Sequence, residues 1–543
     1  MIENDKTESW LQANFYVAIL VLLVYVFMPF FWSGWATAHC EEDAYYYFAI
    51  ARNLADGKGI TYNGEWTNGF QPLWLFFLSP IFLFKSSLIF PLKLALLVGG
   101  LFFLLGGFMV YRSGLLLFSE KSLACFSAIL WLTSVFAFEQ SVNGLETGLY
   151  FFCLSLLVYV YLKRIRLNEN PGLRDWVYLG LLSGICFLAR IDVCLILIPL
   201  WIAGVWHSYR ADKIGARALC AENVETKVSR TTRKNLYFIF IGFLVFLALA
   251  LPWVFYNLWL WANPLPVSAL FAKLQFWQKM TFKWRAVMSI KALLRLPIFY
   301  PFSFYTFFRH WNRLNFILLV IGSGIWLVLF IFDRKLREKV LRLPLISFIF
   351  AGAFLTLGYL IPTTAHWFIP RYLSPLILLL SFYIAIFWHH YLRKVPVLFG
   401  IICACLVFVL VYLDFYGVMY KQMNQKYYMN FYRLENIEWI KKNLPENAPI
   451  GCFQSGIYHY YLTPEGYTVY NLDGKMSISA YKALKGNYLG SYIRDKGIVY
   501  VIDWPQYLQP FFRNYKMERD KDYRILATLG SDSLAEMLYN NRE

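Results

Sequence analysis

The chain has 543 residues, of which 59% are hydrophobic and 20% aromatic, while only 15% are charged. A soluble protein of this length needs a far more polar surface than this composition provides. Runs of about twenty apolar residues recur along most of the sequence, and each is long enough to cross about 30 Å of hydrocarbon. The composition therefore indicates a mainly α-helical, polytopic membrane protein.

The formal net charge is +18, which raises the question of nucleic-acid binding. We exclude a nucleic-acid partner, because the basic residues cluster in short loops between apolar runs, where the positive-inside rule places them. The first apolar run is too long for the h-region of a signal peptide and has no clean small-residue cleavage site. We therefore expect it to remain as the first membrane helix.

Eleven membrane-spanning helices are expected from the apolar runs. The apolar piece at 72–84 is not among them, because it has 13 residues and an internal proline. Such a length favours an interfacial or re-entrant segment. In chain order, the expected spans lie near 14–36, 91–112, 122–141, 147–165, 174–190, 193–209, 236–259, 314–332, 343–362, 372–392 and 395–414.

The basic loops test this count. With eleven crossings and the N-terminus inside, all five loops assigned to the cytoplasm are basic, as the rule requires. Counting 72–84 as a span would put the basic 207–235 loop outside. We therefore expect a protein of the cytoplasmic (inner) membrane whose N-terminus is inside and whose C-terminal region is outside. The membrane part would be 1–414, with outer loops 37–90, 260–313 and 363–371.

The sequence changes character from about residue 415, where charged residues return and the apolar runs shorten. The piece GIVYVIDW at 497–504 is typical of a buried strand, and RLENIEWIKKNL at 433–444 has a helical pattern. We expect 415–543 to form a soluble extracytoplasmic domain of the α/β or α+β class. Its tyrosines at 458, 460 and 461, if exposed, are compatible with sugar contact, although tyrosine in a small domain is more often core.

Under this topology the unusual polar residues gather on the outer side. Ionisable groups at a membrane boundary are expensive to desolvate and tend to mark a functional site. The inner loops carry basic residues but no comparable mixture of acids, amides and aromatics. The outer candidates are Glu41, Glu42 and Asp43 after the first helix, Glu146 in NGLETGLY, Arg190 and Asp192 in LARID, Lys273 at the end of NPLPVSALFAK, and His366 and Arg371 in HWFIPRYLSP.

Each candidate also has a purely structural explanation. Asp43 can cap a short aromatic helix that Gly57 ends, although capping does not explain Glu42 as well. Glu146 can flank the positive end of the following helix. The remaining explanations are a structural ion pair for Arg190 with Asp192, which we favour over catalysis, a snorkelling anchor for Arg371, and a lipid-headgroup contact for Lys273.

Taken together, the polar residues carry the parts needed for sugar transfer from a lipid phosphate. A carboxylate near the membrane surface can deprotonate a hydroxyl acceptor. Cations such as Arg371 and Lys273 can hold a phosphate or diphosphate and stabilise the leaving group. The aromatic loops offer flat faces for sugars and apolar walls for a lipid tail.

The first outer loop resembles that of bacterial GT-C glycosyltransferases, which use polyprenyl-phosphate-linked sugars. Members carry an acidic pair, then N-L-x-x-G-x-G, then T-N-G-x-x-P-L-W. NGLETGLY looks like their second acidic loop, NPLPVSALFAK like the proline-rich loop ending in a lysine, PRYLSP like the late arginine motif, and VYNLDGKMS at 469–477 like a segment of their outer domain. In this chain the first-loop motifs are Glu42-Asp43, Asn53-Leu54 with Gly57 and Gly59, and Thr67-Asn68-Gly69 with Pro72-Leu73-Trp74.

The resemblance implies an inverting transferase of GT-C-like fold, with its active site on the non-cytoplasmic face. Asp43 or Glu42 would be the general base, and we favour Asp43 because it begins the aromatic helix. Glu146 would contact or position the acceptor. The donor phosphate would be held by Arg371, Lys273 and His366, with Asn68, Arg190 and Asp192 in supporting positions.

The resemblance leaves several partners open. The donor would be a polyprenyl-phosphate sugar and the acceptor an envelope glycan, lipid or protein, in contact with membrane lipids, but no loop specifies either sugar or acceptor. Some relatives use a divalent cation, and the chain offers no clear ligand set beyond the acids themselves, so the cofactor stays open. The outer domain either binds the acceptor, which we favour, or covers the site.

Two other functions compete with sugar transfer. A transporter or flippase of lipid-linked sugars places charges near the bilayer midplane and often shows internal repeats. Here the polar residues sit at one face and no repeat is evident, so the enzyme is favoured. A glycan polymerase or ligase shares the outer-face chemistry and remains an alternative.

Overall fold

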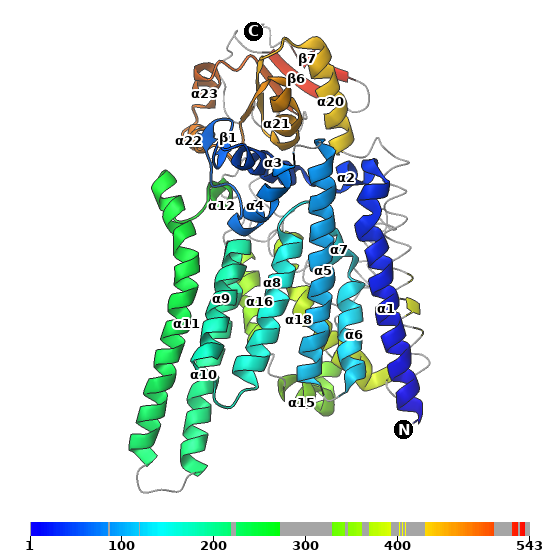
Figure 1. Cartoon of the computed structure of the whole chain (residues 1–543), viewed down its shortest axis with the longest axis vertical. Coiled ribbons are helices and arrows are strands. Elements are labelled where there is room, and N and C mark those ends of the chain that lie inside the picture. The colour runs from blue at the N-terminus through cyan, green and yellow to red at the C-terminus, as the bar shows by residue number, and fades with distance from the viewer. Residues whose placement is uncertain are drawn as a thin grey trace.

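The computed structural model shows a mostly helical chain in which a bundle of long helices carries a mixed β-sheet with its own helices at one end (Figure 1). The short helix α3 and its loop lie between the two parts (Figure 1). The structure describes residues 2–84, 87–118, 120–218, 224–271, 328–342, 346–360, 369–392, 401, 404–405, 408, 429–503, 524–529 and 533–537.

The bundle helices are long and apolar. Within the described residues, five are long and apolar enough to cross a membrane, or up to seven if each of two bent pairs is one span. This is the composition of a polytopic membrane protein. The helices are α1 (Ile2–Phe31), α5 (Ile89–Leu117), α6 (Lys121–Leu132), α7 (Val135–Ser141), α8 (Thr147–Val160) with a π-helical continuation (Tyr161–Arg166), α9 (Leu173–Ala189), α10 (Cys194–Ala218), α11 (Val224–Trp261), α15 (Arg334–Arg342), α16 (Ile346–Leu360), α17 (Ile369–Leu373) and α18 (Leu376–Leu392).

Nine of the eleven predicted spans overlap these helices, with differences in length, but the candidate spans number five to seven and not eleven. The helix predicted at 174–190 is α9, whose 17 residues are too few for a candidate span, and the one at 372–392 contains α18, an apolar helix that is also too short. The segment 72–84 forms α4 (Pro72–Leu78) and a 3-10 turn (Ser79–Leu83), again too short. The predicted spans at 314–332 and 395–414 lie largely outside the described residues.

Two predicted helices are wrong as single straight elements. The first run ends at Phe31, and residues Ser33–His39 form a separate helix, α2. The run at 122–141 bends by 58° between α6 and α7. At the bend, the Thr133 hydroxyl donates to the Ile129 carbonyl, and Ser134 caps α7 by accepting from the backbone N–H of Ala137. Side chains that bond to nearby backbone in this way end one helix and start the next.

The two ends of the bundle differ in charge. The N-terminus, the basic helix α15 and the turn between α8 and α9 lie at one end, while α2, α3 and the sheet lie at the other (Figure 1). In α15, Leu336 and Val340 are buried while Arg334, Lys335 and Arg337 are not. The basic residues of the described bundle therefore concentrate away from the sheet.

The five-stranded sheet has the order β4-β3-β5-β6-β7, with β6 and β7 antiparallel and all other neighbours parallel. The chain passes from β3 to β4 on one side of β3 and then to β5 on its other side, so the sheet has a topological switch point between β3 and β5. We call the sheet with helices α20–α23 the tail unit. Its elements are α20 (Met429–Asn443), β3 (Pro449–Cys452), α21 (Gly456–Leu462), β4 (Thr468–Asn471), α22 (Ile478–Lys485), α23 (Leu489–Asp495), β5 (Tyr500–Asp503), β6 (Arg524–Leu529) and β7 (Ser533–Met537).

The loop between α1 and α5 joins the bundle to the tail unit. Its helix α3 (Glu42–Ala55) is buried from Ala44 through Ala51, so bulk water reaches little of its first three turns. A helix apolar on all sides is stable only when other elements cover every face. The loop continues with the hairpin β1 (Thr61–Tyr62) and β2 (Glu65–Trp66) and then α4, and the short helix α12 (Val267–Phe271) packs beside the same region.

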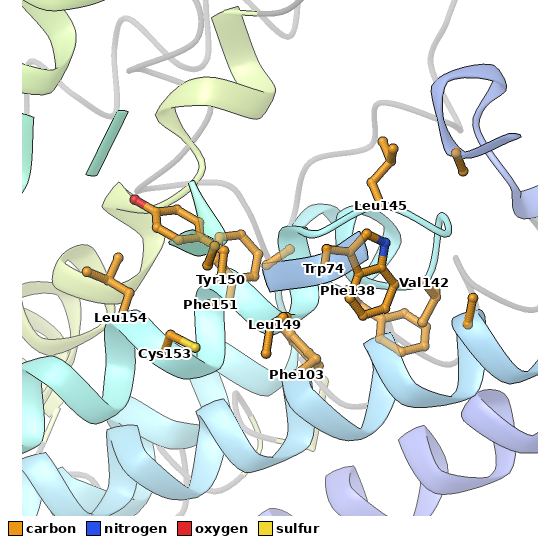
Figure 2. Close-up of a cluster of buried hydrophobic side chains, with 14 of the residues drawn as sticks. Trp74, Phe103, Phe138, Val142, Leu145, Leu149, Tyr150, Phe151, Cys153 and Leu154 are labelled. Atoms are coloured by element: carbon orange, nitrogen blue, oxygen red, sulfur yellow. The ribbon is translucent and has the colours of Figure 1, made fainter. Parts of the chain in front are cut away.

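An apolar cluster supports the second acidic loop (Figure 2). Trp74 from α4, Phe103 from α5 and Phe138 from α7 are all buried beneath the turn that leads into α8. The indole N–H of Trp74 donates to the carbonyl of Gly144 at 3.0 Å. The position of that turn is thus set by large buried side chains, each of which stabilises the fold by about 2–3 kcal/mol when removed from water.

Glycines allow the closest helix crossings in the bundle. A Cβ added at Gly99 of α5 would overlap the carbonyl oxygen of Ser141 at the end of α7, and one added at Gly148 of α8 would overlap the carbonyl of Gly99. A backbone oxygen cannot move aside without moving its helix. A Cβ added at Gly106, about two turns further along α5, would meet only side-chain atoms at 3.5 Å or more.

We expect Gly99→Val to destabilise the bundle by about 1–3 kcal/mol, because the added methyl groups force α5 away from α7 and α8. Thermal unfolding of the detergent-solubilised protein measures the effect as a lower Tm. Gly106→Ala in the same helix is the matched control and should unfold near the wild-type temperature. Equal unfolding temperatures for the two variants would contradict the crossing described here.

Candidate functional site

Helix α3 presents two different faces because residues four apart lie above one another on a helix. Glu42 and Tyr46 form the face toward the tail unit. The Glu42 Oε1 atom accepts from the backbone N–H of Gly456 at 2.6 Å, and the Tyr46 hydroxyl accepts from the N–H of Ser455 at 3.2 Å. A Cβ at Gly456 would come within 2.7 Å of Glu42, so the contact requires glycine.

Asp43 and Tyr47 form the neighbouring face of α3, toward the bundle. The Asp43 Oδ2 atom lies 3.9 Å from a terminal guanidinium nitrogen of Arg371. The Tyr47 hydroxyl donates to Glu146 Oε2 at 3.1 Å and accepts from the N–H of Gln71 at 2.9 Å. The two acid–tyrosine pairs, each spaced four residues apart, therefore place docking contacts on one face of α3 and site contacts on the next.

Three residues predicted from separate loops meet at this place. Arg371 of α17 donates to Glu146 Oε1 at 3.1 Å while also approaching Asp43. Glu146 precedes α8 and is buried, and 17% of the Arg371 side chain is exposed. The guanidinium thus links the first acidic loop to the second.

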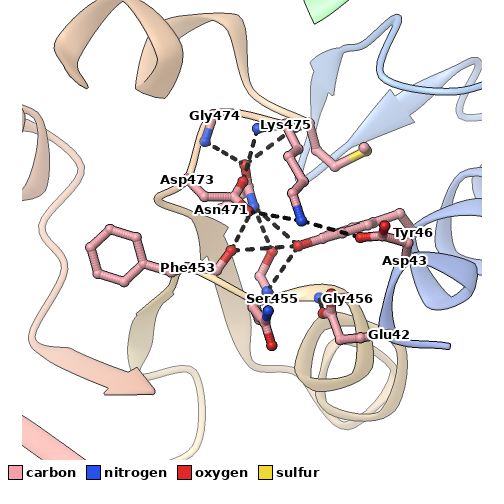
Figure 3. A network of polar contacts seen from close by, with 12 residues as sticks. Glu42, Asp43, Tyr46, Phe453, Ser455, Gly456, Asn471, Asp473, Gly474 and Lys475 are labelled. Carbon is pink, nitrogen blue, oxygen red and sulfur yellow. Dashed lines mark hydrogen bonds and ion pairs between the residues drawn. The ribbon is translucent and has the colours of Figure 1, made fainter. Parts of the chain in front are cut away.

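A fourth charged residue comes from the tail unit. The ammonium of Lys475 lies 3.2 Å from Asp43 Oδ1 and 3.6 Å from Asp473 Oδ2, and only 13% of its side chain is exposed (Figure 3). The sequence singles out the segment 469–477 as a family-like piece but gives Lys475 no role. The available signal was the DGK tripeptide within that segment.

The loop that carries Lys475 is built by backbone hydrogen bonds to side chains (Figure 3). Asn471 Oδ1 accepts from the N–H groups of Gly474 and Met476 at 3.0 and 3.2 Å, and Asp473 Oδ1 accepts from the N–H of Lys475 at 2.8 Å. Gly474 has a φ of +78°, a conformation that favours glycine. The loop therefore has one defined shape into which the lysine is fixed.

The two neighbouring acids of α3 have different electrostatic environments. Burial raises the pKa of Glu42 to about 7, and the positive charges of Arg433 and Lys475 only partly oppose this. Partial burial also acts to raise the pKa of Asp43, but the nearby charges of Lys475 and Arg371 outweigh it and lower that pKa below its ordinary value. At neutral pH Asp43 is therefore ionised, whereas Glu42 is close to half protonated.

Asn68 fastens the first loop to the loop after α11. Its amide nitrogen donates to Asn257 Oδ1 at 2.9 Å, and its oxygen accepts from the N–H of Val267 at 3.1 Å. The side chain is fully buried. Asn68 thus supports the site by holding two loops together, and it makes no contact with Asp43 or Arg371 among the described hydrogen bonds.

Arg190 and Asp192 form the structural ion pair that the sequence favours. Two guanidinium nitrogens of Arg190 contact the two Asp192 oxygens at 3.1 and 2.6 Å. The guanidinium also lies about 5 Å from the rings of Tyr150 and Tyr372, at 5.1 and 5.3 Å. Tyr372 is adjacent to Arg371 in the chain. The contact of Arg190 with the Tyr372 ring therefore helps to hold the segment that carries Arg371.

Two predicted site residues lie outside the described residues, and the predicted capping role of Asp43 is wrong. Lys273 and His366, predicted to hold the donor phosphate, lie outside the described residues. Asp43 is not the cap of α3, because the helix begins at Glu42 and Glu41 is its N-cap.

The tyrosines of the tail unit are not an exposed sugar platform. Tyr458 and Tyr460 are fully buried, and Tyr461 is partly buried. Arg52 of α3 donates to the Tyr460 carbonyl at 3.0 Å and lies over its ring, while the Tyr460 hydroxyl donates to the Leu88 carbonyl at 2.8 Å. Tyr460 and Tyr461 also lie against Tyr45 of α3, at 5.7 and 6.0 Å between ring centroids, a contact that no local pattern indicates, whereas the Tyr458 hydroxyl accepts from Asn436 of α20.

The chain matches no protein-family model and no protein in a search of curated sequences. Among the described residues, no group of three or more His, Cys, Asp or Glu side chains is arranged to hold a metal ion.

The arrangement combines a reachable carboxylate with an available cation. The Asp43 side chain is 29% exposed, so an incoming hydroxyl can approach it. The Arg371 Nε atom is buried and, within the described part of the chain, has no hydrogen-bond partner. A buried donor without a partner is costly, which is the condition that an anionic ligand would relieve.

The raised pKa of Glu42 predicts a pH dependence of stability. Between its ordinary value of 4.5 and about 7, the folded protein binds more protons than the unfolded chain, so stability falls as pH rises and then levels off. Glu42→Gln keeps the Oε1 acceptor for Gly456 and removes this dependence. Relative to wild type, we expect the variant to gain about 2 kcal/mol between pH 5 and pH 8.

Thermal unfolding at several pH values measures this gain. Glu438→Gln is the control for the loss of one carboxylate, because Glu438 lies on α20 with 76% of its side chain exposed. A Glu42→Gln difference that is constant with pH would contradict the assignment of a near-neutral titration to Glu42.

Proposed function

We propose that the protein is an inverting glycosyltransferase of the GT-C type. It would transfer a sugar from a polyprenyl-phosphate-linked donor to a hydroxyl group of an envelope glycan, lipid or protein. The observation that carries the proposal is the meeting of Asp43, Glu146 and Arg371, from three distant segments, at one end of an apolar helical bundle. That end is where a lipid-linked donor and a water-borne acceptor can reach the same residues.

The proposal includes a topology. We infer eleven spans in the cytoplasmic membrane, counting the predicted helices outside the described residues, with the N-terminus inside. The common position of the N-terminus and the basic helix α15 supports this orientation, because cytoplasmic loops carry the excess of Lys and Arg. The tail unit, and with it the soluble domain expected at 415–543, would then face the outer side, as would the site.

The proposed reaction begins at the acceptor hydroxyl. Its proton moves to the Asp43 carboxylate as its oxygen attacks the anomeric carbon from the side opposite the phosphate. The bond between the anomeric carbon and the phosphate oxygen breaks, and its electron pair leaves with the polyprenyl phosphate. The configuration at the anomeric carbon is inverted because attack and departure occur on opposite sides.

Arg371 would receive the charge of the leaving phosphate. Its contact with Asp43 is long at 3.9 Å, whereas Glu146 holds it at 3.1 Å. A phosphate can therefore replace the long contact with Asp43 at the terminal guanidinium nitrogen without breaking the Glu146 contact that orients the guanidinium. When a phosphate pairs with Arg371, the positive charge of the guanidinium stabilises the ionised Asp43 carboxylate less. The pKa of Asp43 then rises, which makes Asp43 a stronger base.

The position of the charges supports an enzyme over a transporter. The site lies where the bundle meets α3 and the tail unit, and not midway along the long helices (Figure 1). Transporters of charged lipids place such residues near the midplane on broken helices. A glycan polymerase or ligase would use the same site chemistry with a larger donor.

We expect Asp43→Asn to fold normally and to lose roughly 10²-fold or more in transfer rate, because the amide keeps the shape and removes the base. Glu42→Gln should stay within about tenfold of wild type, because Glu42 faces the tail unit. The measurement is sugar transfer by purified protein from a panel of polyprenyl-phosphate donors. Full activity of Asp43→Asn would exclude it as the base. Movement of a lipid-linked sugar across vesicles without any transfer would instead support the flippase.

Arg371→Gln should reduce kcat/KM for the donor by on the order of 10²-fold, because the variant loses the charge that meets the leaving phosphate. Arg334→Gln is the matched control, since Arg334 is exposed on α15 at the opposite end of the bundle and pairs only with Glu338 among the described residues. If both substitutions leave kcat/KM for the donor unchanged, Arg371 does not bind the phosphate.

A further inference from the structure

Two lysines of the tail unit form ion pairs with acids of the first loop. Lys496 lies 2.6 Å from Glu65, whose other oxygen accepts from the hydroxyls of Ser477 and Ser479 at 3.0 and 2.7 Å. This pair is about one-third exposed and fastens the hairpin to the tail unit. The second pair, between Lys475 and Asp43, lies at the proposed site and is less exposed on the lysine side.

The charges around Lys475 distinguish between two roles for it, which are binding the donor phosphate and acting on Asp43. Two carboxylates, of Asp43 and Asp473, lie within 3.6 Å of its ammonium. Its charge is therefore already compensated, which makes it a poor second ligand for a phosphate. Of these two carboxylates, the closer one belongs to the residue that we propose as the base, so the charge of Lys475 acts on Asp43.

The loop geometry makes this effect directional. The backbone around Lys475 is held by the Asn471 and Asp473 side chains described above. Its carbonyl oxygen sits so close to Gly69 of the first loop that any Cβ there would overlap it. The Lys475 ammonium thus approaches the Oδ1 atom of Asp43 from a fixed direction. Arg371, a second cation, lies near the Oδ2 atom of the same carboxylate.

We infer that Lys475 is a positioning residue of the transfer site, supplied by the tail unit to hold the Asp43 carboxylate ionised and oriented toward the acceptor. The inference rests on the function proposed above. It gives the tail unit a direct part in the reaction, in addition to covering the site or binding the acceptor.

Removing Lys475 should change when Asp43 titrates. Burial raises the pKa of Asp43, and the charge of Lys475 opposes this effect. Without Lys475 the pKa of Asp43 is therefore expected to rise, so that the carboxylate becomes protonated on the acid side of neutrality. The charged groups that face Asp43 are Lys475 and Asp473 from the loop after β4, Arg371 from α17, Arg433 from α20, and Glu42 beside it on α3.

The first test is the pH profile of kcat/KM for sugar transfer, measured in a Glu42→Gln background so that Glu42 does not contribute. We expect Lys475→Met to move the acid limb upward by about one pH unit or more, and Lys475→Arg to leave it near that of the parent. Lys496→Met is the matched control, because it removes the other interdomain pair, and its profile should keep the parent's shape. A Lys475→Met rate reduced equally at every pH would overturn the inference.

The second test does not need activity. Infrared difference spectra recorded during a pH titration report the protonation of Asp43, whose band is assigned by its loss in Asp43→Asn. We expect the band to titrate at higher pH in Lys475→Met than in wild type, and an unchanged titration overturns the inference. If wild type transfers no sugar from any donor, the proposed function fails, while this titration still decides whether Lys475 holds Asp43 ionised.

A third variant covers the case in which Lys475→Met does not fold. Asp473→Asn keeps the Oδ1 acceptor for the Lys475 N–H but removes the competing charge, so the lysine acts on Asp43 alone. We expect the Asp43 band to titrate at lower pH than in wild type. A titration at the same or higher pH would overturn the inference.

Discussion

Charged side chains that leave bulk water need partners, and this constraint organises the end of the bundle that carries the tail unit. Asp43 contacts Lys475 and Arg371, and Arg371 contacts Glu146. Such a chain of opposite charges adds little net stability, because desolvation offsets most of the attraction. Removing one member leaves the charge of its partner without compensation, which costs more the more deeply that partner is buried. The four elements that supply these residues are therefore held to one relative arrangement.

The apolar parts of the chain place those elements before the charges can meet. The Trp74, Phe103 and Phe138 cluster fixes the turn that ends in Glu146, and the glycine crossing of α5 and α8 sets the distance between their helices. Van der Waals packing of this kind is strong in sum and tolerates little displacement. The ion pairs then select among arrangements that the packing already restricts.

The tail unit docks through the edge of its sheet formed by the carboxyl ends of β3 and β4. In open parallel sheets, ligands bind outside the carboxyl ends of the strands, at the topological switch point. Here the segments after β3 and β4 supply the Gly456 N–H and the Lys475 ammonium, and both contact the first turn of α3. The helix of the membrane part occupies the place of a ligand, which ties the tail unit to the site.

Local sequence patterns predict individual helices and strands of this structure, but not which of them contact one another. Apolar runs locate most bundle helices, because length and hydrophobicity act within one segment. The bend at Thr133 depends on two hydroxyl contacts, and the burial of Tyr460 depends on α3 and Leu88. Asp43 and Lys475 are 432 positions apart, so no spacing rule connects them. Acids in outer loops are recognisable individually, whereas the cation that holds one of them comes from the fold of the tail unit.

The division of work between Glu42 and Asp43 follows from helix geometry. Adjacent residues on a helix point about 100° apart, so one acid enters the tail unit while the next faces the bundle. Glu42 is buried, one of its oxygens accepts from the Gly456 N–H, and its pKa is raised to about 7. Asp43 keeps 29% of its side chain exposed and is held ionised by two cations. A general base must be both ionised and reachable. Of the two acids, Asp43 alone meets both conditions, and Glu42 instead makes a docking contact to the tail unit.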